Sequence, residues 1–403
     1  MVVPRYTKII NRDFVLFECI VILTNISFAM IMPVMSGAAI SFGAGGALMG
    51  LAAGMYAIIS LVSRPFTNPL VDTLNKRRQY RFGLVLYIIS YTGLALSKGV
   101  GPLIAFRCLQ GLGMGIMGPV SAALAGLYVP EDKAAAGIGA NVLLSTAANM
   151  AIGPVLSGFI VEHMGYSACF LAAGMMCVAC LALTLCITDL DRDGAAKYRM
   201  GPPHLPKFED FFCRECLVPG IMTCCFTMVY GCMYSFMFQA AQEHGVPGID
   251  IFFTIYAITT VIIRPATAAL GDRFGQGRLI APCALVAAVG LAVCANAHSL
   301  AMYLVAAVLL AIGYGSASIV LLVICAQRVR PERRGLACGT YYMGMDLGTG
   351  VGPVIGGVVA FAFGYGGMMY FLIIPVVLGA VIGCVAPGAL RPLGGEARKV
   401  QGI

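Results

Sequence analysis

Charged residues are scarce in this sequence, and tryptophan is absent. Only 11% of the 403 residues are charged, whereas 60% are hydrophobic. Because soluble proteins carry about a quarter charged residues, this composition excludes an ordinary soluble domain. Without tryptophan, tyrosine must supply any aromatic belt at a membrane surface.

Histidine is also rare, and the sixteen cysteines do not form ligand sets. The four histidines are scattered over predicted loops, although an enzyme within a membrane would need polar side chains grouped at one depth. Neither Cys-x-x-Cys pair, at 177–180 and 213–216, has the second ligand pair that a zinc site requires. We therefore expect no enzymatic activity, no metal and no cofactor.

What the sequence does contain is hydrophobic stretches long enough to cross a bilayer, which takes ~20 residues of helix. The twelve stretches lie near 14–36, 46–66, 80–97, 101–128, 135–161, 166–187, 216–241, 249–270, 279–297, 300–327, 336–362 and 366–390. They are too long and too uniformly apolar for the strands of a membrane barrel. The sequence predicts an all-α membrane protein with twelve transmembrane helices.

The sequence repeats itself at a spacing of about two hundred residues. The matching segments are 56–72 with 256–272, 109–115 with 309–315, and 153–158 with 352–357. A polar linker with three prolines, residues 188–215, separates six stretches from six. We predict two pseudo-symmetric six-helix bundles, residues 1–187 and 216–403, related by an axis along the membrane normal.

The positions of the cations predict the orientation of the chain. If the N-terminus is inside, the inner segments hold nearly all Lys and Arg residues, and the outer loops hold only Lys98. This bias predicts that both termini are cytoplasmic and that the linker is too. The net charge of +8 follows from the same bias, so we expect no nucleic-acid partner. Short loops without a large insert indicate a bacterial inner membrane.

The loop after the second stretch and its repeat share charged residues, with Asp72 and Arg77 in one copy and Asp272 and Arg273 in the other. At these residues the sequence resembles the major facilitator superfamily, whose Gly-x-x-x-Asp-Arg-x-Gly-Arg-Arg/Lys loop locks helix ends together on the cytoplasmic side. The first copy lacks the glycines and the first arginine of that pattern. The resemblance implies that these four residues form a latch between carboxylates, cations and helix ends. A solvated basic loop would explain the cations but not the recurring Asp.

The fourth stretch carries Arg107-Cys-Leu-Gln110-Gly, which is similar to the Arg-x-x-Gln-Gly-x-Gly motif of the same family. Arg107 lies ~9 Å below the outer boundary at 1.5 Å per residue. An arginine there is costly unless it faces protein, water or a partner. The resemblance implies a role for Arg107 in proton coupling or gating. The alternative is a structural role, in which Arg107 only bonds neighbouring carbonyls.

Residues 152–158 resemble the Gly-Pro-x-x-Gly-Gly signature of the drug:proton antiporter branch, with Ser157 in place of a glycine. This resemblance favours export over uptake. Residues 352–357 match the pattern even better, so common ancestry of the repeats is the competing explanation.

Two acids lie inside predicted spans. Asp346 is ~15 Å deep in the eleventh stretch. Glu18 is only ~6 Å from the inner boundary and could reach water by snorkelling, so it is the weaker candidate. A bare charge near the midplane costs at least ~2.5–3.5 kcal/mol. This cost favours the protonated form of a carboxylate there, as a reversible proton carrier requires. The alternatives for Asp346 are a permanent cation partner or a hydrogen bond between helices.

Aromatic residues recur every four positions on the seventh stretch, where Tyr230 and Tyr234 could contact an amphiphilic ligand. Ordinary helix packing explains such a stripe equally well. The candidate substrate-binding residues are Asn25, Gln110, Tyr230, Tyr234, Gln239 and Tyr314.

Together these patterns predict a secondary transporter that exports a small organic molecule by alternating access, coupled to protons and working as a monomer in the bilayer. The alternatives are a proton-coupled symporter for uptake and a membrane sensor that transports nothing.

Overall fold

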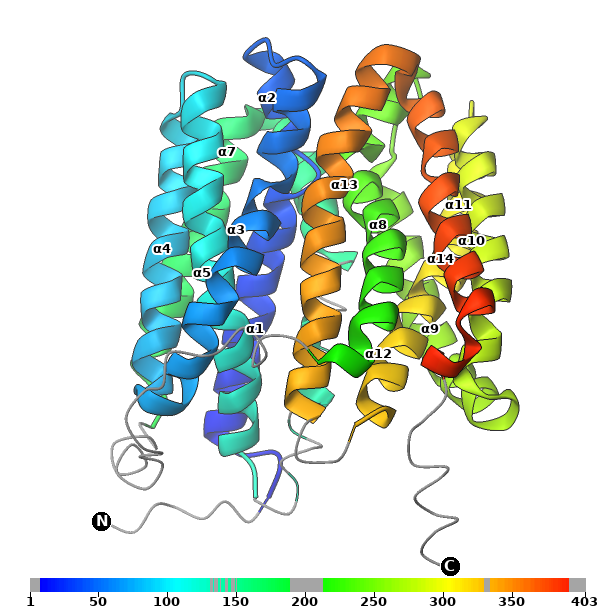
Figure 1. Cartoon of the computed structure of the whole chain (residues 1–403). Coiled ribbons are helices and arrows are strands. Elements are labelled where there is room, and N and C mark those ends of the chain that lie inside the picture. Colours follow the sequence, from blue (N-terminus) through cyan, green and yellow to red (C-terminus); the bar gives the residue numbers. More distant parts are fainter. Residues whose placement is uncertain are drawn as a thin grey trace, which may run out of the picture. The chain divides into compact units, whose positions relative to one another are not determined.

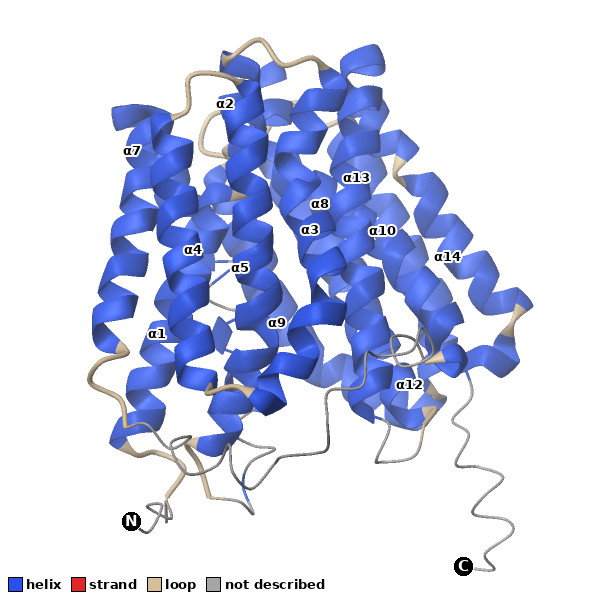
Figure 2. Ribbon diagram, turned by 60° about the vertical axis from the view of Figure 1, so that its left-hand side comes forward, coloured by secondary structure: helices blue, strands red, loops and turns tan. Residues whose placement is uncertain are grey.

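The fold was analysed in a computed structural model, which describes residues 8–130, 133, 137, 139–141, 144, 145, 149, 151–188, 213–329 and 334–390. Among these residues there are helices and loops but no strand (Figure 2). This confirms the predicted all-α class. The predicted linker lies largely outside the described residues, so the division into domains at that linker stays a prediction.

Most helices coincide with the predicted hydrophobic stretches, but α2 lies mainly in the gap predicted between the first two, where a loop was expected. Much of the fifth predicted stretch lies outside the described residues. In the first half they are α1 (Arg12–Ile31), α2 (Met35–Ser41), α3 (Gly46–Thr73), α4 (Lys76–Leu96), α5 (Val100–Leu127) and α7 (Gly153–Leu183). In the second half they are α8 (Leu217–Glu243), α9 (Asp250–Phe274), α10 (Ile280–Ala295), α11 (Leu300–Leu310), α12 (Ser316–Gln327), α13 (Arg334–Phe371) and α14 (Ile373–Val385). Short helical turns η4 (Arg214–Cys216), η5 (Gln276–Leu279) and η8 (Pro387–Leu390) flank α8, α10 and α14.

Several helices begin at a side chain that satisfies a free backbone N–H group of the first turn. The side-chain oxygen of Asn11 accepts a hydrogen bond from the backbone N of Phe14 at 2.9 Å, and Asn75 accepts one from Arg78 at 2.9 Å. Asparagine is among the preferred residues for this position. These polar residues therefore set where α1 and α4 start.

Nine helices in the described part of the chain are long and apolar enough to cross a membrane, against the twelve predicted. Two of the nine contain an internal break, so each of them combines parts of two predicted stretches. Gly165 in α7 has a φ of 82°, and Gly364 in α13 has a φ of 73°. Both breaks coincide with predicted outer loops. Helix α4 is not among the nine, because the basic residues in its first turns make it less apolar. The number twelve stays a prediction.

The chain packs as two compact units, each with its own core. Unit 1 comprises Met1–Gly43 and Met55–Leu205, and unit 2 comprises Ala44–Gly54 and Pro206–Ile403. In unit 1, α4 packs against α5 and α7, and α7 packs against α1 (Figure 1). In unit 2, α8 packs along α13, and α10 packs against α11 and α14 (Figure 1).

Glycines allow these helices to approach closely. A Cβ on Gly111 of α5 would collide with the backbone carbonyl oxygen of Tyr56 in α3. In unit 2 a Cβ on Gly348 of α13 would collide with the carbonyl oxygen of Cys224 in α8. Side chains larger than hydrogen would therefore force these backbones apart.

One turn inside the tenth predicted span departs from α-helical geometry. Residues Ala311–Gly315, labelled η6, form a π-helical turn between α11 and α12. π-turns are rare and are frequently found at functional sites. This turn contains Tyr314, one of the predicted substrate-binding residues.

Candidate functional site

Unit 1 encloses a cavity of about 140 Å³ between its helices. The predicted residue Asn25 lines it, with its side-chain amide donating a hydrogen bond to the carbonyl oxygen of Val21 at 2.9 Å. The other lining residues are Thr24, Phe28, Tyr80, Tyr87, Met114, Met117, Gly118, Ser121 and Asn149. The lining is thus mainly aromatic and methionine surface with a few hydrogen-bonding groups, which suits an amphiphilic molecule or part of one.

Glu18 lies buried in α1, with 4% of its surface exposed. The side-chain amide of Asn141 donates to its two carboxylate oxygens, at 3.1 and 3.4 Å. The hydroxyl of Ser121, which lines the cavity, donates in turn to the side-chain oxygen of Asn141 at 3.4 Å. A chain of hydrogen bonds therefore connects the buried carboxylate with the cavity.

Asn141 and Ser121 were missed in the sequence analysis. A polar side chain within a predicted span is itself a signal of function, and Asn141 lies in the fifth predicted stretch. Its partner, however, is 123 positions away in the chain, so the sequence alone gives no indication that it contacts Glu18.

Arg107 is completely buried in α5 and is surrounded by neutral groups. Its guanidinium donates to the side-chain oxygen of Gln110 and lies 4.4 Å from the ring centre of Tyr56. One terminal nitrogen is 3.8 Å from the sulfur of Met32. A cation over an aromatic ring is attracted by the negative face of the ring, and the attraction is stronger away from water.

Gln110 lies beside Arg107 and not on the wall of the cavity. It is fully buried, accepts from Arg107, and donates from its amide nitrogen to the hydroxyl of Tyr91 at 3.1 Å. The predicted gating residue and this predicted substrate residue thus belong to one cluster. In this arrangement Gln110 orients the guanidinium of Arg107.

In unit 2 the predicted tyrosines lie together. The ring centres of Tyr230 and Tyr234 are 4.8 Å apart, and Tyr230 stacks on Tyr314 at 5.3 Å with an interplanar angle of 17°. Phe253 of α9 extends the cluster, with its ring centre 4.9 Å from that of Tyr234. Gln239, nine positions beyond Tyr230 on α8, is also buried, at 9% exposure.

Asp346, the other predicted proton carrier, is buried in α13 of unit 2, at 1% exposure. The hydroxyl of Thr349 donates to its backbone carbonyl oxygen at 3.2 Å. Glu18 and Arg107 belong to unit 1, so the three predicted coupling residues are divided between the units.

The predicted latch residues lie at helix ends. Arg77 donates to the carbonyl oxygen of Thr184 through its Nε at 3.0 Å, and to that of Leu185 at 3.2 Å. Arg81 donates to the same Thr184 carbonyl at 2.8 Å. These carbonyls end α7, where cations are favoured by the helix dipole. The side chain of Asp72 lies outside the described residues.

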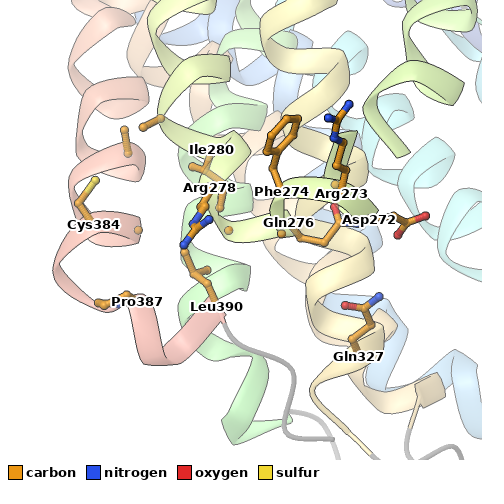
Figure 3. A pocket seen from close by; sticks show the side chains of 16 residues that line it. Asp272, Arg273, Phe274, Gln276, Arg278, Ile280, Gln327, Cys384, Pro387 and Leu390 are labelled. Atoms are coloured by element: carbon orange, nitrogen blue, oxygen red, sulfur yellow. The ribbon is translucent and has the colours of Figure 1, made fainter. Parts of the chain in front are cut away.

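In the second copy of the motif, Asp272 and Arg273 are exposed at the end of α9. The guanidinium carbon of Arg273 lies 5.2 Å from the ring centre of Phe274. Both residues line a larger cavity of about 840 Å³ at this end of unit 2 (Figure 3).

Within the described part of the chain, no group of three His, Cys, Asp or Glu side chains is arranged to hold a metal ion. Unit 1 brings together a buried carboxylate, a buried guanidinium and a cavity lined largely by aromatic and methionine side chains.

Comparison with known proteins identifies the family. The sequence profile described as Major Facilitator Superfamily matches residues 18–248 and again 219–401. The multi-drug resistance efflux pump PmrA of Streptococcus pneumoniae is 23% identical over 363 residues, covering 86% of this chain and 89% of that protein. The tetracenomycin C resistance and export protein of Streptomyces glaucescens is 30% identical over 145 residues, covering 35% of this chain and 26% of that protein.

Solved transporter structures have the same fold. The nucleoside transporter NupG superposes with a TM-score of 0.74 at 12% identity, covering 93% of this chain and 99% of that one. A bacterial homolog of the human lysosomal transporter Spinster superposes with a TM-score of 0.71 at 17% identity, covering 94% and 97%. Because the family profile matches both halves of the sequence, this chain is a membrane transporter, not an enzyme, and it belongs to the Major Facilitator Superfamily.

Proposed function

We propose that this protein exports a small organic molecule in exchange for protons, by alternating access between two six-helix halves of a twelve-helix monomer. The two halves are residues 1–187 and 216–403, joined by a cytoplasmic linker. The protein lies in the inner membrane, and both of its termini are in the cytoplasm. The cation bias of the sequence supports this orientation.

The observation that carries the proposal is the hydrogen-bonded path from Glu18 through Asn141 to Ser121, because Ser121 also lines the cavity of unit 1. Burial disfavours the charged form of a carboxylate, whereas the Asn141 amide stabilises it. These two opposing effects suit a carboxylate that binds and releases a proton. Occupation of the cavity by a substrate would disturb Ser121 and bias Glu18 toward one state.

Arg107 supports coupling in a second way. As a buried cation with aromatic and neutral partners, it adds a positive potential to the interior of the half that contains Glu18. We assign Arg107 to gating, and Asp346 to a second proton site in the other half.

Export, as opposed to uptake, is supported by the relatives named for efflux and by the Gly-Pro motif at residues 152–158. Uptake by symport is the competing function, because nucleoside and peptide transporters have this fold. A non-transporting sensor is the third possibility.

The direction in which protons move distinguishes the three. A thermal-shift screen against neutral, anionic and cationic amphiphiles first supplies a bound compound. Proteoliposomes that contain the protein and the pH-sensitive dye pyranine are then given this compound outside. An antiporter carries protons out as the compound enters, so the lumen becomes alkaline. A symporter makes the lumen acidic. With a sensor, the compound stays outside and the luminal pH does not change.

A further inference from the structure

The larger cavity, in unit 2, is built from the ends of several helices. Its walls are the end of α9, the η5 turn, the start of α10, and the ends of α12 and α14, with η8 closing one side (Figure 3). Its volume is about 840 Å³. It lies at the predicted cytoplasmic ends of the helices. Asp272 and Arg273 of the predicted latch line it, but neither Arg278 nor the apolar wall has a role in the proposed transport mechanism.

Two arginines and one aspartate line this cavity. Figure 3 places Arg278 between Ile280 and Leu390, whereas Asp272 lies on the opposite side. Arg273 lies toward Asp272, with its guanidinium carbon 5.2 Å from the ring centre of Phe274. Within the described residues neither arginine forms an ion pair, so both have N–H donors available. The planar array of donors in arginine matches the oxygens of a phosphate group.

Beside Arg278 the wall of the cavity is apolar and made of small residues. Ala281 of α10 and Ala380 and Gly383 of α14 line it, and these two helices pack against each other. The surfaces just beyond are exposed and apolar, with Leu285 at 67% and Val381 at 49% exposure. In a membrane these side chains would contact lipid, so the seam between α10 and α14 opens toward acyl chains.

The η8 turn is held in place, so the cavity exists without a ligand. Arg328 donates from one guanidinium nitrogen to the carbonyl oxygen of Gly388 and from Nε to that of Glu215, both at 2.8 Å. Leu390 packs over Gly383 and Gly277, where an added Cβ would lie 3.5 and 3.0 Å from its side chain. A preformed site avoids the entropic cost of ordering its walls on binding.

We propose that this cavity binds an anionic phospholipid, with the phosphate on Arg278 and one acyl chain along Ala281, Ala380 and Gly383. Two guanidinium groups against the single carboxylate of Asp272 select a negative headgroup. The apolar half of the wall offers nothing to a free phosphate ion but matches a hydrocarbon chain.

The test compares lipids and variants on the full-length protein in detergent. Native mass spectrometry counts bound phosphatidylglycerol, phosphatidylcholine or inorganic phosphate, and thermal melting follows stabilisation by each. We expect phosphatidylglycerol to bind and to raise the melting temperature, whereas phosphatidylcholine and inorganic phosphate do not. Arg278→Gln should weaken phosphatidylglycerol binding roughly tenfold, since a charge-assisted hydrogen bond is lost.

Two further variants locate the lipid within the cavity. Ala281→Phe starts from an exposed position and fills the apolar groove, so it should also weaken binding while both arginines remain. Arg78→Gln removes an equally exposed arginine from the start of α4, outside the cavity, and should bind as the wild type does. Without added lipid, unchanged melting temperatures show that the variants are folded.

The proposal is overturned by any of three results. If inorganic phosphate stabilises the protein as much as phosphatidylglycerol, the site binds free anions. Equal binding of phosphatidylcholine would mean that charge does not select the headgroup. Unchanged phosphatidylglycerol binding by either Arg278→Gln or Ala281→Phe would place the lipid elsewhere.

Discussion

At the scale of single residues, two buried charged side chains of unit 1 have neutral hydrogen-bonding partners. Glu18 has the amide of Asn141, and Arg107 has Gln110 and the ring of Tyr56. A neutral partner lowers the cost of burying a charge without fixing its protonation state, whereas an opposite charge at contact would strongly favour the ionised form. Such an environment suits a carboxylate that must gain and lose a proton during a transport cycle.

The first prediction concerns the proton carrier. Glu18→Gln retains an oxygen that can accept from Asn141 but cannot release a proton. We expect uptake driven by a pH gradient to vanish in proteoliposomes, while exchange of labelled for unlabelled compound across the membrane continues. Asp346→Asn, assayed in parallel, tests the second carboxylate. Proton-driven accumulation by the Glu18→Gln protein would assign the coupling to Asp346.

The second prediction concerns Arg107. Arg107→Lys keeps the positive charge but loses the planar group that reaches Gln110 and Met32 and covers Tyr56. We expect the transport rate to fall at least about tenfold, because a charge-assisted hydrogen bond is lost. Cys108→Ser, next to it in α5, is the control and should transport normally. A Lys variant as active as the wild type would make Arg107 a purely structural residue.

The sequence predicted part of this residue-level arrangement. The three-residue spacing of Arg107 and Gln110 places both on one face of α5, so their contact follows from helical geometry. Tyr56, Met32 and Tyr91 come from other helices, and no local pattern predicts which of them would meet Arg107. The same holds for Asn141 and Glu18, because contacts between distant segments depend on how the helices pack.

At the scale of helices, hydrophobic runs located the spans but not all of their ends. α4 begins at Lys76, four residues before the predicted span, because a helix can continue into polar surroundings when Asn75 caps it. The π-helical turn at Ala311–Gly315 could not have been predicted, since it depends on backbone bonding and not on composition. The breaks at Gly165 and Gly364 were predicted as loops, and their positive φ values explain why glycine is there.

The third prediction compares two glycines of α5. Gly111→Ala adds a methyl group against the carbonyl oxygen of Tyr56, whereas at Gly118 an added Cβ meets no atom within 4 Å. We expect Gly111→Ala to destabilise the protein by about 1–3 kcal/mol, as overpacking does. Gly118→Ala should leave stability unchanged or raise it by up to about 1 kcal/mol, because alanine favours helix. Melting temperatures of the purified variants provide the measurement. Similar melting of the two would show that α5 and α3 can separate freely.

At the scale of the whole molecule, duplication has kept the packing residues but not the buried charges. Tyr56 and Tyr256 occupy equivalent positions and are both buried, at 3% and 0% exposure. By contrast, the positions that correspond to Arg107 and Gln110 hold Ala307 and Leu310. The repeat therefore supplies a common helical scaffold with a shared loop aspartate, whereas Arg107 and Gln110 belong to the first half alone.

The fourth prediction concerns the orientation of the chain in the membrane. Single cysteines are introduced into a variant without native cysteines and labelled from outside intact cells with an impermeant maleimide. Lys98→Cys should be labelled because it lies in a predicted outer loop, and Arg78→Cys should be protected until the membrane is permeabilised. Labelling of Arg78→Cys in intact cells would reverse the topology.

The π-helical turn before α12 also means that the tenth span contains a spare residue. A π-turn arises where one additional residue is accommodated locally within an α-helix. Deleting Ile312 should therefore convert α11 and α12 into one continuous α-helix, in which the side chains at both ends still point toward the same neighbouring helices. Deleting Val229 from the uninterrupted α8 should instead rotate everything that follows in that helix by about 100°, since a turn takes 3.6 residues. We expect the first deletion to yield folded protein by size-exclusion chromatography and the second to aggregate. The additional residue of the π-helical turn at Tyr314 would then allow the helix to change its length and to rotate without unfolding.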